Sequence, residues 1–269
     1  MQEPQSTAQD TTQPNPQPNP QPNPEPNPES NAKQFLVIFN KIEHTLQDIY
    51  GATKYVGFKR MVETLSQENS LIHEFAVDLM EYLQLRNAIV HKTTGEPIAE
   101  PHDDVLVEIT MLYEKLVHPP TALELAARPV YSCSTSDSLD VVVTQMKQHF
   151  YSMVPIYHDN RFVGVLSDHS LVLWLGDMVG DRAINLRDHT VANLQEYFGH
   201  EDDKYSGYRF TTTHTDVYTI RDFFMSFTSE KKRLGAVFLT RTGNSFDKIE
   251  GIITAWDVWK IVGLEQKSE

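Results

Sequence analysis

The sequence lacks long apolar segments and is almost free of cysteine. It contains no run of about 18 or more apolar residues, the length at which a membrane-spanning helix is considered, and its first thirty residues are polar. A secretory signal would place an apolar stretch near the start of the chain. The single cysteine, Cys133, has no partner for a disulfide within the chain. We therefore expect a cytoplasmic protein without a membrane segment, in which Cys133 is a small buried residue.

Basic residues are scarce relative to acidic ones. The 269 residues include 23 Lys and Arg against 37 Asp and Glu, which gives a formal net charge of -14. This charge opposes nonspecific attraction to nucleic acid and to anionic lipid. One cysteine without clustered histidines also argues against a structural metal site. We expect no DNA partner, no membrane partner and no metal, and an RNA partner would need a local basic patch.

The first 31 residues are dominated by proline and asparagine in the repeat QPNPQPNPQPNPEPNPES. Proline has no backbone N–H and biases the residue before it toward extended conformations. Residues 1–31 are therefore predicted to be a disordered, semi-stiff tail that acts as a spacer.

Residues 32–120 show the three- and four-residue spacing of apolar side chains that is typical of amphipathic helices. In the first stretch the spaced residues are Phe35, Ile38, Phe39, Ile42, Leu46 and Ile49. Three further stretches of this region also show the helical spacing of apolar residues. The region is predicted to be a bundle of about four helices.

Residues 121–269 combine short β-branched runs with helical stretches, and this pattern occurs twice. SDSLDVVVTQM (136–146) aligns with TDVYTIRDFFM (215–225), and VGVLSDHSLV (163–172) aligns with EGIITAWDVW (250–259). Two copies of one unit, at about 127–178 and 208–263, indicate a pseudo-twofold pair with a cleft between them. The expected fold class is α+β in two domains: a helical bundle followed by a tandem pair of α/β units.

A candidate ligand site lies where the last strand of the second copy turns into a helix, in the segment GIITAWD (251–257). The hydroxyl of Thr254 and the free N–H groups of the helix N-terminus suit an anionic or polar ligand group. Asp257 would lie one turn inside the helix, where its carboxylate can accept hydrogen bonds from both hydroxyls of a ribose. The alternative is local: Thr254 caps the helix and Asp257 favours its dipole without any ligand.

This segment, together with YSMVPIYHDNRFVGVLS (151–167) of the first copy, resembles tandem CBS domains, the Bateman module. The resemblance covers roughly Ala127 to Gly263 and implies a module that binds adenine-containing nucleotides in its clefts. It also implies which residues flank the adenine of the second copy, namely Thr211, Gly235, Ala236 and Val237. The ligand would be regulatory and not an obligatory cofactor, and its identity stays open among AMP, ATP, a cyclic dinucleotide and S-adenosylmethionine.

The first copy departs from this pattern, because Ser170 stands where the acidic residue is expected in GVLSDHS. A single hydroxyl cannot hold a ribose diol as a carboxylate does. We therefore expect one competent cleft around Thr254 and Asp257, and a weaker second cleft around Ser167 and Ser170.

The helical region contains a polar run, LRNAIVH (85–91). Arg86 and His91 are five residues apart, which separates them by about 140° around an α-helix, so they cannot form a compact pair on one helix. Asn87 and His91, four residues apart, share a face. A local alternative assigns Arg86 to an ion pair with an acidic neighbour and His91 to a helix C-terminus.

The same run resembles the motif of HEPN domains, all-α domains marked by an arginine, a polar residue, a short apolar stretch and a histidine. The resemblance implies a homodimer in which arginines and histidines of two chains converge on one RNA phosphate without metal. His91 would transfer a proton, Arg86 would stabilise charge on the phosphate, and Asn87 would orient them. The chain has Thr93 where many nuclease members carry an aromatic residue.

Two functions follow from these patterns. In the first, the protein is a regulatory nucleotide sensor, whose CBS pair controls a helical domain that binds a protein partner or a second chain. In the second, it is a nucleotide-gated, metal-independent endoribonuclease that uses Arg86 and His91 across a dimer. The sequence alone leaves open whether the helical domain is catalytic.

Overall fold

The computed structural model describes residues 30–51, 53–90, 99–180, 184–201, 203–229 and 232–259. The candidate catalytic residue His91 and nearly all of the predicted tail lie outside these residues.

The described residues before position 118 form helices joined by short connections, as the spacing of apolar residues predicts. The helices are α1 (Asn31–Tyr50), α2 (Phe58–Glu68), α3 (Ser70–Glu74), α4 (Ala76–Ile89) and α5 (Asp103–Val117). Ser30 caps α1 by accepting a hydrogen bond from the N–H of Lys33. Asn69 caps α3 in the same way through the N–H of Ile72.

The apolar stripe of α1 supplies much of the helical core. Its fully buried members are Ala32, Phe35, Phe39, Ile42 and Leu46. The ring of Phe39 stacks on that of Phe58, with centroids 4.8 Å apart, and so joins α1 to α2. Ile49 is 40% exposed, because a 3.6-residue period carries it to the edge of the stripe.

The rest of the chain forms two three-stranded sheets with the same topology. The first contains β1 (Cys133–Ser134), β2 (Met153–His158) and β3 (Arg161–Ser167), with helices α7 (Leu139–His149) and α8 (Asp168–Asp177). The second contains β4 (Gly207–Thr212), β5 (Leu234–Thr240) and β6 (Gly251–Ile253), with helix α9 (Val217–Ser229) and a helical segment at 255–259. In each sheet the middle strand pairs parallel to the first strand and antiparallel to the last. This shared topology agrees with the internal repeat of the sequence.

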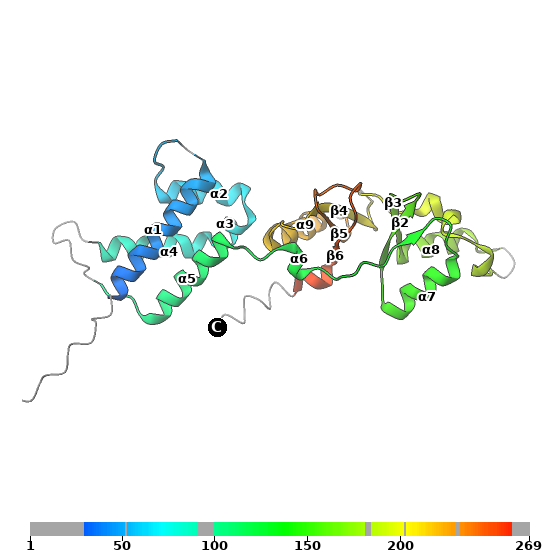
Figure 1. Ribbon diagram of the computed structural model, residues 1–269, viewed down its shortest axis with the longest axis horizontal. Coiled ribbons are helices and arrows are strands. Elements are labelled where there is room, and N and C mark those ends of the chain that lie inside the picture. Colours follow the sequence, from blue (N-terminus) through cyan, green and yellow to red (C-terminus); the bar gives the residue numbers. More distant parts are fainter. Residues whose placement is uncertain are drawn as a thin grey trace, which may run out of the picture.

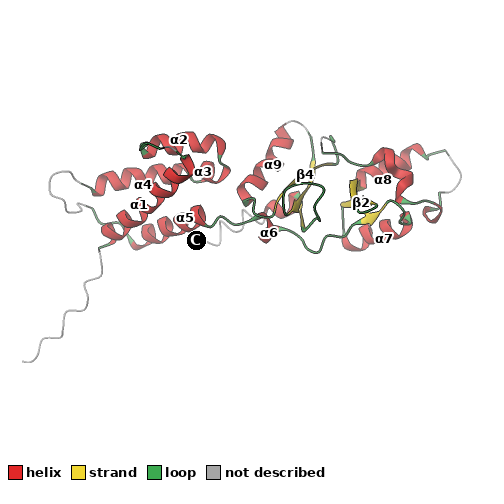
Figure 2. Cartoon of the chain, turned by 45° about the horizontal axis from the view of Figure 1, so that its top comes forward, coloured by secondary structure: helices red, strands yellow, loops and turns green. Residues whose placement is uncertain are grey.

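The second copy lies between the helical region and the first copy, so the order in space differs from the order in sequence (Figures 1 and 2). The connection from α5 to the first copy passes through α6 (Ala122–Leu125), which runs along the second copy. The N–H of Ala122 donates to the carbonyl of Thr215 at 2.7 Å, and the N–H of Ala127 donates to that of Ile252 at 2.9 Å. A segment that precedes the first copy therefore belongs structurally to the second.

A separate apolar cluster joins the two copies. Its buried members are Met153, Val165, Tyr208, Ala236, Phe238 and Ile249. The Met153 side chain lies directly over Gly235, so closely that a Cβ at that position would meet it. The two middle strands, β2 and β5, therefore face each other across the junction.

None of the described helices is long and apolar enough to cross a membrane. Cys133 is buried, as expected, and burial raises the pKa of its thiol to about 12.

We predict that Phe35→Ala lowers the free energy of unfolding by about 3–5 kcal/mol, because it leaves a cavity in the core shared by α1 and its neighbours. Val37→Ala is the matched control, since Val37 lies on the same helix but is 51% exposed, and it should change stability by about 0.5 kcal/mol or less. Urea denaturation followed by circular dichroism measures both. Equal effects of the two substitutions would contradict the assigned burial.

Candidate functional site

Thr254 and Asp257 bind each other in this structure. The carboxylate oxygen Oδ2 of Asp257 accepts hydrogen bonds from the backbone N–H and from the hydroxyl of Thr254, both at 2.9 Å. These bonds close the first turn of the helical segment that follows β6, but Asp257 is the acceptor and the Thr254 hydroxyl a donor, which differs from the local alternative in which Thr254 caps the helix. A ligand that used both residues would have to replace these bonds.

The other sequence-predicted residues of this cleft lie in different surroundings. Gly235 and Thr254 line one cavity of about 40 Å³, together with Ser167, Arg233 and Trp256. Ligand pockets generally have volumes of about 300–1,000 Å³, so this cavity in its present form is too small for a nucleotide.

Thr211 and the two residues that follow Gly235 lie elsewhere on the sheet. Thr211 pairs with Leu239, three residues along β5 from Ala236. Ala236 and Val237 are fully buried, Ala236 in the cluster between the copies and Val237 in the larger core. The structure thus brings Gly235 and Thr254 together and leaves Thr211 farther along the strand.

The corresponding serines of the first copy are closed off from solvent. Ser167 and Ser170 are 2% and 1% exposed, and their hydroxyl oxygens are 2.9 Å apart. Ser206, from the segment before β4, brings a third hydroxyl within 2.7 Å of that of Ser167. Ser167 also caps α8 by accepting from the N–H of Ser170 at 3.0 Å. The hydroxyls on which a weaker cleft would depend are therefore hydrogen-bonded to one another.

A cavity of about 360 Å³ lies where the first copy meets the β5–β6 loop of the second copy. Its lining residues are Val130, Ser132, Pro155, Tyr157 and Asn160 from the first copy and Phe246, Asp247, Lys248 and Ile249 from the second. The walls combine apolar and polar side chains, and burial raises the pKa of Tyr157. This volume and this mixture of groups suit a small organic ligand.

The charged groups of this cavity differ in their availability. The Asp247 carboxylate accepts hydrogen bonds from the backbone N–H of Thr242 at 3.0 Å and from its hydroxyl at 2.6 Å, which lower the pKa of Asp247. Within the described residues, the ammonium of Lys248 takes part in no ion pair. The cavity therefore offers one cation to an anionic ligand group.

The sequence patterns do not indicate this cavity or Lys248. Lys248 lies in TRTGNSFDK (240–248), a loop that the repeat marks only as an insertion in the second copy. The first copy has no equivalent of these extra residues, so the path of this loop cannot be inferred from the repeat. The position of Lys248 opposite Pro155 follows only from the packing of the copies.

Arg86 and Asn87 line another cavity, of about 460 Å³, between α1, α2 and α4. Phe39, Phe58 and Leu83 form its apolar part, and Glu43, Tyr55, Lys59, Arg60 and Glu63 complete its lining. Arg86 donates a hydrogen bond to the side-chain oxygen of Asn87 at 3.3 Å. Within the described residues it forms no ion pair, which differs from the local alternative that assigned it an acidic partner.

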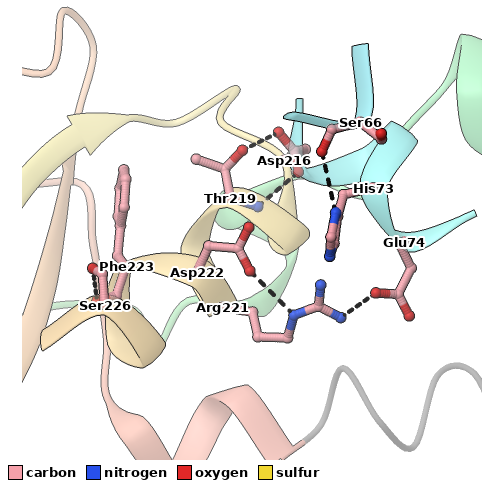
Figure 3. Close-up of polar contacts among 9 residues, drawn as sticks. All are labelled: Ser66, His73, Glu74, Asp216, Thr219, Arg221, Asp222, Phe223 and Ser226. Atoms are coloured by element: carbon pink, nitrogen blue, oxygen red, sulfur yellow. Dashed lines mark hydrogen bonds and ion pairs between the residues drawn. The ribbon is translucent and has the colours of Figure 1, made fainter. Parts of the chain in front are cut away.

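The helical region contacts the second copy through α3 and α9 (Figure 3). Arg221 of α9 donates to the Glu74 carboxylate at 2.6 Å and lies 3.5 Å from that of Asp222. Burial disfavours the charged guanidinium, but the two carboxylates more than offset this, and the pKa of Arg221 is raised. Beside this ion pair, the Tyr218 and Phe75 rings meet edge to face at 5.6 Å. Phe75 links α3 to α4, the helix that carries Arg86.

Comparisons with known proteins agree with this architecture. Residues 122–177 match the family model of the CBS domain. No curated protein matches the sequence. The match covers the first copy, and the second copy shares its strand order, which supports a tandem CBS module.

Several solved CBS structures are similar to about half of the chain. One is the CBS domain pair of protein MJ0100 in complex with 5'-methylthioadenosine and S-adenosyl-L-methionine, at 11% identity over 55% of this chain and 98% of that chain, with a TM-score of 0.39. Another is CBSX2 in complex with AMP, at 15% identity over 55% and 98%, with a TM-score of 0.38. A third is the CBS domain of a bacterial CNNM/CorC family Mg2+ transporter in complex with ATP, at 19% identity over 54% and 88%, with a TM-score of 0.37.

We predict that Arg221 and Glu74 are energetically coupled. A double-mutant cycle with Arg221→Ala and Glu74→Ala should give a coupling energy of about 1–3 kcal/mol, because both side chains are less than a third exposed. The exposed pair Lys59 and Glu63, 3.6 Å apart on α2, is the control and should give about 0.5 kcal/mol or less. Chemical denaturation of the four proteins of each cycle measures both values, and equal coupling in the two pairs would argue against a structural role for Arg221.

Proposed function

We propose that this protein is a regulatory nucleotide sensor, in which the tandem CBS module binds an adenine-containing nucleotide and thereby controls the helical region. The observation that carries this proposal is the 360 Å³ cavity lined by both copies. A ligand in that position touches both halves of the module, so its binding depends on how the two halves are arranged.

The chemistry of the cavity supports a nucleotide. Val130, Pro155 and Ile249 offer apolar surface to a planar base, and the Ser132 hydroxyl can donate or accept a hydrogen bond. The Lys248 ammonium suits a phosphate group. AMP, ATP and S-adenosyl-L-methionine, which occur in the similar CBS structures, are the natural probes.

The site predicted from Thr254 and Asp257 remains a second location for the same ligand. Its use would require Asp257 to exchange Thr254 for a ribose and the small cavity beside Gly235 to widen. The two locations can be distinguished, because Lys248 lines only the larger cavity and Thr254 only the smaller one.

A physical route leads from the module to the helical region. The second copy carries the β5–β6 loop with Lys248 and also α9 with Arg221. Through Glu74 and Phe75, α9 contacts the junction of α3 and α4. A ligand that favours one arrangement of the second copy would therefore bias the position of α4, provided that its affinity differs between the arrangements.

We predict that calorimetric titration detects binding of at least one of AMP, ATP and S-adenosyl-L-methionine. Lys248→Ala should weaken AMP and ATP about tenfold or more, because a charge-assisted hydrogen bond contributes about 1.5–3 kcal/mol, and should affect S-adenosyl-L-methionine less. Lys147→Ala, an exposed lysine on α7, is the control and should leave affinity unchanged.

Three results would contradict binding of a nucleotide in the cavity with Lys248. If none of the three compounds binds, the sensor proposal is rejected. If Asp257→Asn abolishes binding while Lys248→Ala does not, the ligand lies at Thr254 and Asp257. If neither substitution changes the affinity, the ligand binds at neither location.

A second candidate function is a nucleotide-gated endoribonuclease. The observation that favours it is the 460 Å³ cavity, where Arg86 and Asn87 lie with Lys59 and Arg60 in a chain of strongly acidic composition. The guanidinium groups of Arg60 and Arg86 suit phosphate oxygens, whereas the Lys59 ammonium lies 3.6 Å from the carboxylate of Glu63. In this candidate a homodimer brings together Arg86 and His91 of two chains, with His91 as the proton-transfer group.

We predict for this candidate that purified protein cleaves single-stranded or structured RNA without added metal, and that Arg86→Ala and His91→Ala each reduce the rate about 10²–10⁴-fold. Arg161→Ala, an exposed arginine on the β2–β3 hairpin, is the control. Light scattering on the same samples measures whether the protein is a dimer. RNA left intact by the wild-type protein, both with and without AMP or ATP, would exclude the nuclease candidate and leave a noncatalytic helical region.

A further inference from the structure

The strand register establishes which residues of the two copies are equivalent. In the first sheet Cys133, Ile156 and Gly164 lie side by side on the three strands. In the second sheet the corresponding row is Thr211, Leu239 and Gly251. Each strand position on one side of the junction between the copies can therefore be matched with a strand position on the other side.

Five residues that line the 360 Å³ cavity can be matched in this way. The cavity residues are Val130, Ser132, Pro155, Tyr157 and Ile249. Their equivalents, in the same order, are Tyr208, Phe210, Phe238, Thr240 and Phe162. One of the five is aromatic on the cavity side, whereas four of the five are aromatic on the opposite side.

On the side opposite the cavity, aromatic rings occupy the equivalent positions. The Phe162 ring meets those of Phe210, Tyr208 and Phe238 at centroid distances of 5.0, 5.4 and 6.0 Å. Phe238 is fully buried and Tyr208 is 7% exposed. These distances are those of packed aromatic pairs, so the rings fill the space that is open on the other side.

Phe162 belongs to the first copy, whereas these three rings belong to the second; Phe162 also meets the ring of Tyr157, in its own copy, at 6.0 Å. Its equivalent on the open side is Ile249, a smaller side chain that the second copy places against Tyr157 and Pro155. Each copy therefore places a residue of its last strand or the loop before it in the site of the other: Phe162 meets three aromatic rings there, whereas Tyr157 is the only aromatic residue among the matched positions that line the cavity with Ile249.

The filled side also seals a polar group. The Thr240 hydroxyl is fully buried and has no hydrogen-bond partner within the described residues. Its equivalent, Tyr157, is partly exposed at the open cavity. The hydroxyl at this position is therefore closed off on the filled side, whereas Tyr157 lines the cavity on the open side.

We infer that the tandem module has one ligand site per chain, beside the first copy, and that Phe162 closes the equivalent site beside the second copy. The identity of the ligand rests on the proposed function, but the closure by Phe162 does not. Binding within one chain is then a single event, and any cooperativity between ligands requires a second chain.

The experiment exchanges residues between the two sides and uses the full-length chain. Ser132→Phe copies Phe210 into the open cavity, and Phe162→Ala removes the closing ring. Phe150→Ala is the matched control, because Phe150 lies in the same copy and is 93% exposed. Calorimetry with AMP gives the number of sites, and calorimetry with indole, a small planar apolar probe, reports an opened aromatic cavity.

The expected result is one AMP per wild-type chain, with affinity lost at least a hundredfold in Ser132→Phe. Phe162→Ala should bind indole, and AMP at a second equivalent, whereas wild type and Phe150→Ala should not. Two AMP molecules per wild-type chain, or unchanged affinity in Ser132→Phe, would overturn the inference. If wild type binds none of AMP, ATP and S-adenosyl-L-methionine, the proposed function fails, and indole then decides about Phe162. Uptake of indole only by Phe162→Ala supports the closure, and no uptake of indole by any of the proteins overturns it.

Discussion

The apolar contact between the two copies is the interaction on which the rest of the module depends. Each sheet has only three strands and would leave one face exposed if it stood alone. Met153, Phe238 and their neighbours cover these faces against each other, and burial of apolar surface is the main favourable contribution to such an assembly. The cavities at the junction are what remains where the side chains of the two copies do not fill the space.

This contact is asymmetric although the two copies have one topology. The side chains at equivalent positions differ in volume, and protein interiors pack too closely for a ring to be added without displacing something. A cluster of rings on one side and a serine and a proline on the other therefore produce one filled and one open position.

The second copy has two neighbours, and this position gives it a special role. One of its faces packs on the first copy, and α9 packs on the helical region through Arg221, drawn in Figure 3, and through Tyr218. The connection around α6 also forms backbone hydrogen bonds with the same copy. A change in the arrangement of the second copy therefore alters its contact with the first copy and its contact with the helical region.

Local patterns in the sequence predicted the elements and the repeat. The spacing of Phe35, Phe39 and Ile42 is enough to predict α1, because helical periodicity depends only on nearby residues. The match of GIITAWD to a strand followed by a helix was found in the same way, and Thr254 and Asp257 do stand at that turn. What the sequence by itself determined is therefore the type and order of the elements, the repetition of one α/β unit, and the position of Thr254 and Asp257 at the turn from strand to helix.

Only the tertiary structure decided how these residues are used. Asp257 is bonded to Thr254, Ser167 is sealed beneath Ser206, and Lys248 reaches a cavity that no spacing in the sequence indicates. The physical reason is that a cleft is defined by the volumes of side chains from strands far apart in sequence. Periodicity reports which face of an element is apolar, but whether two apolar faces leave room between them depends on how they pack.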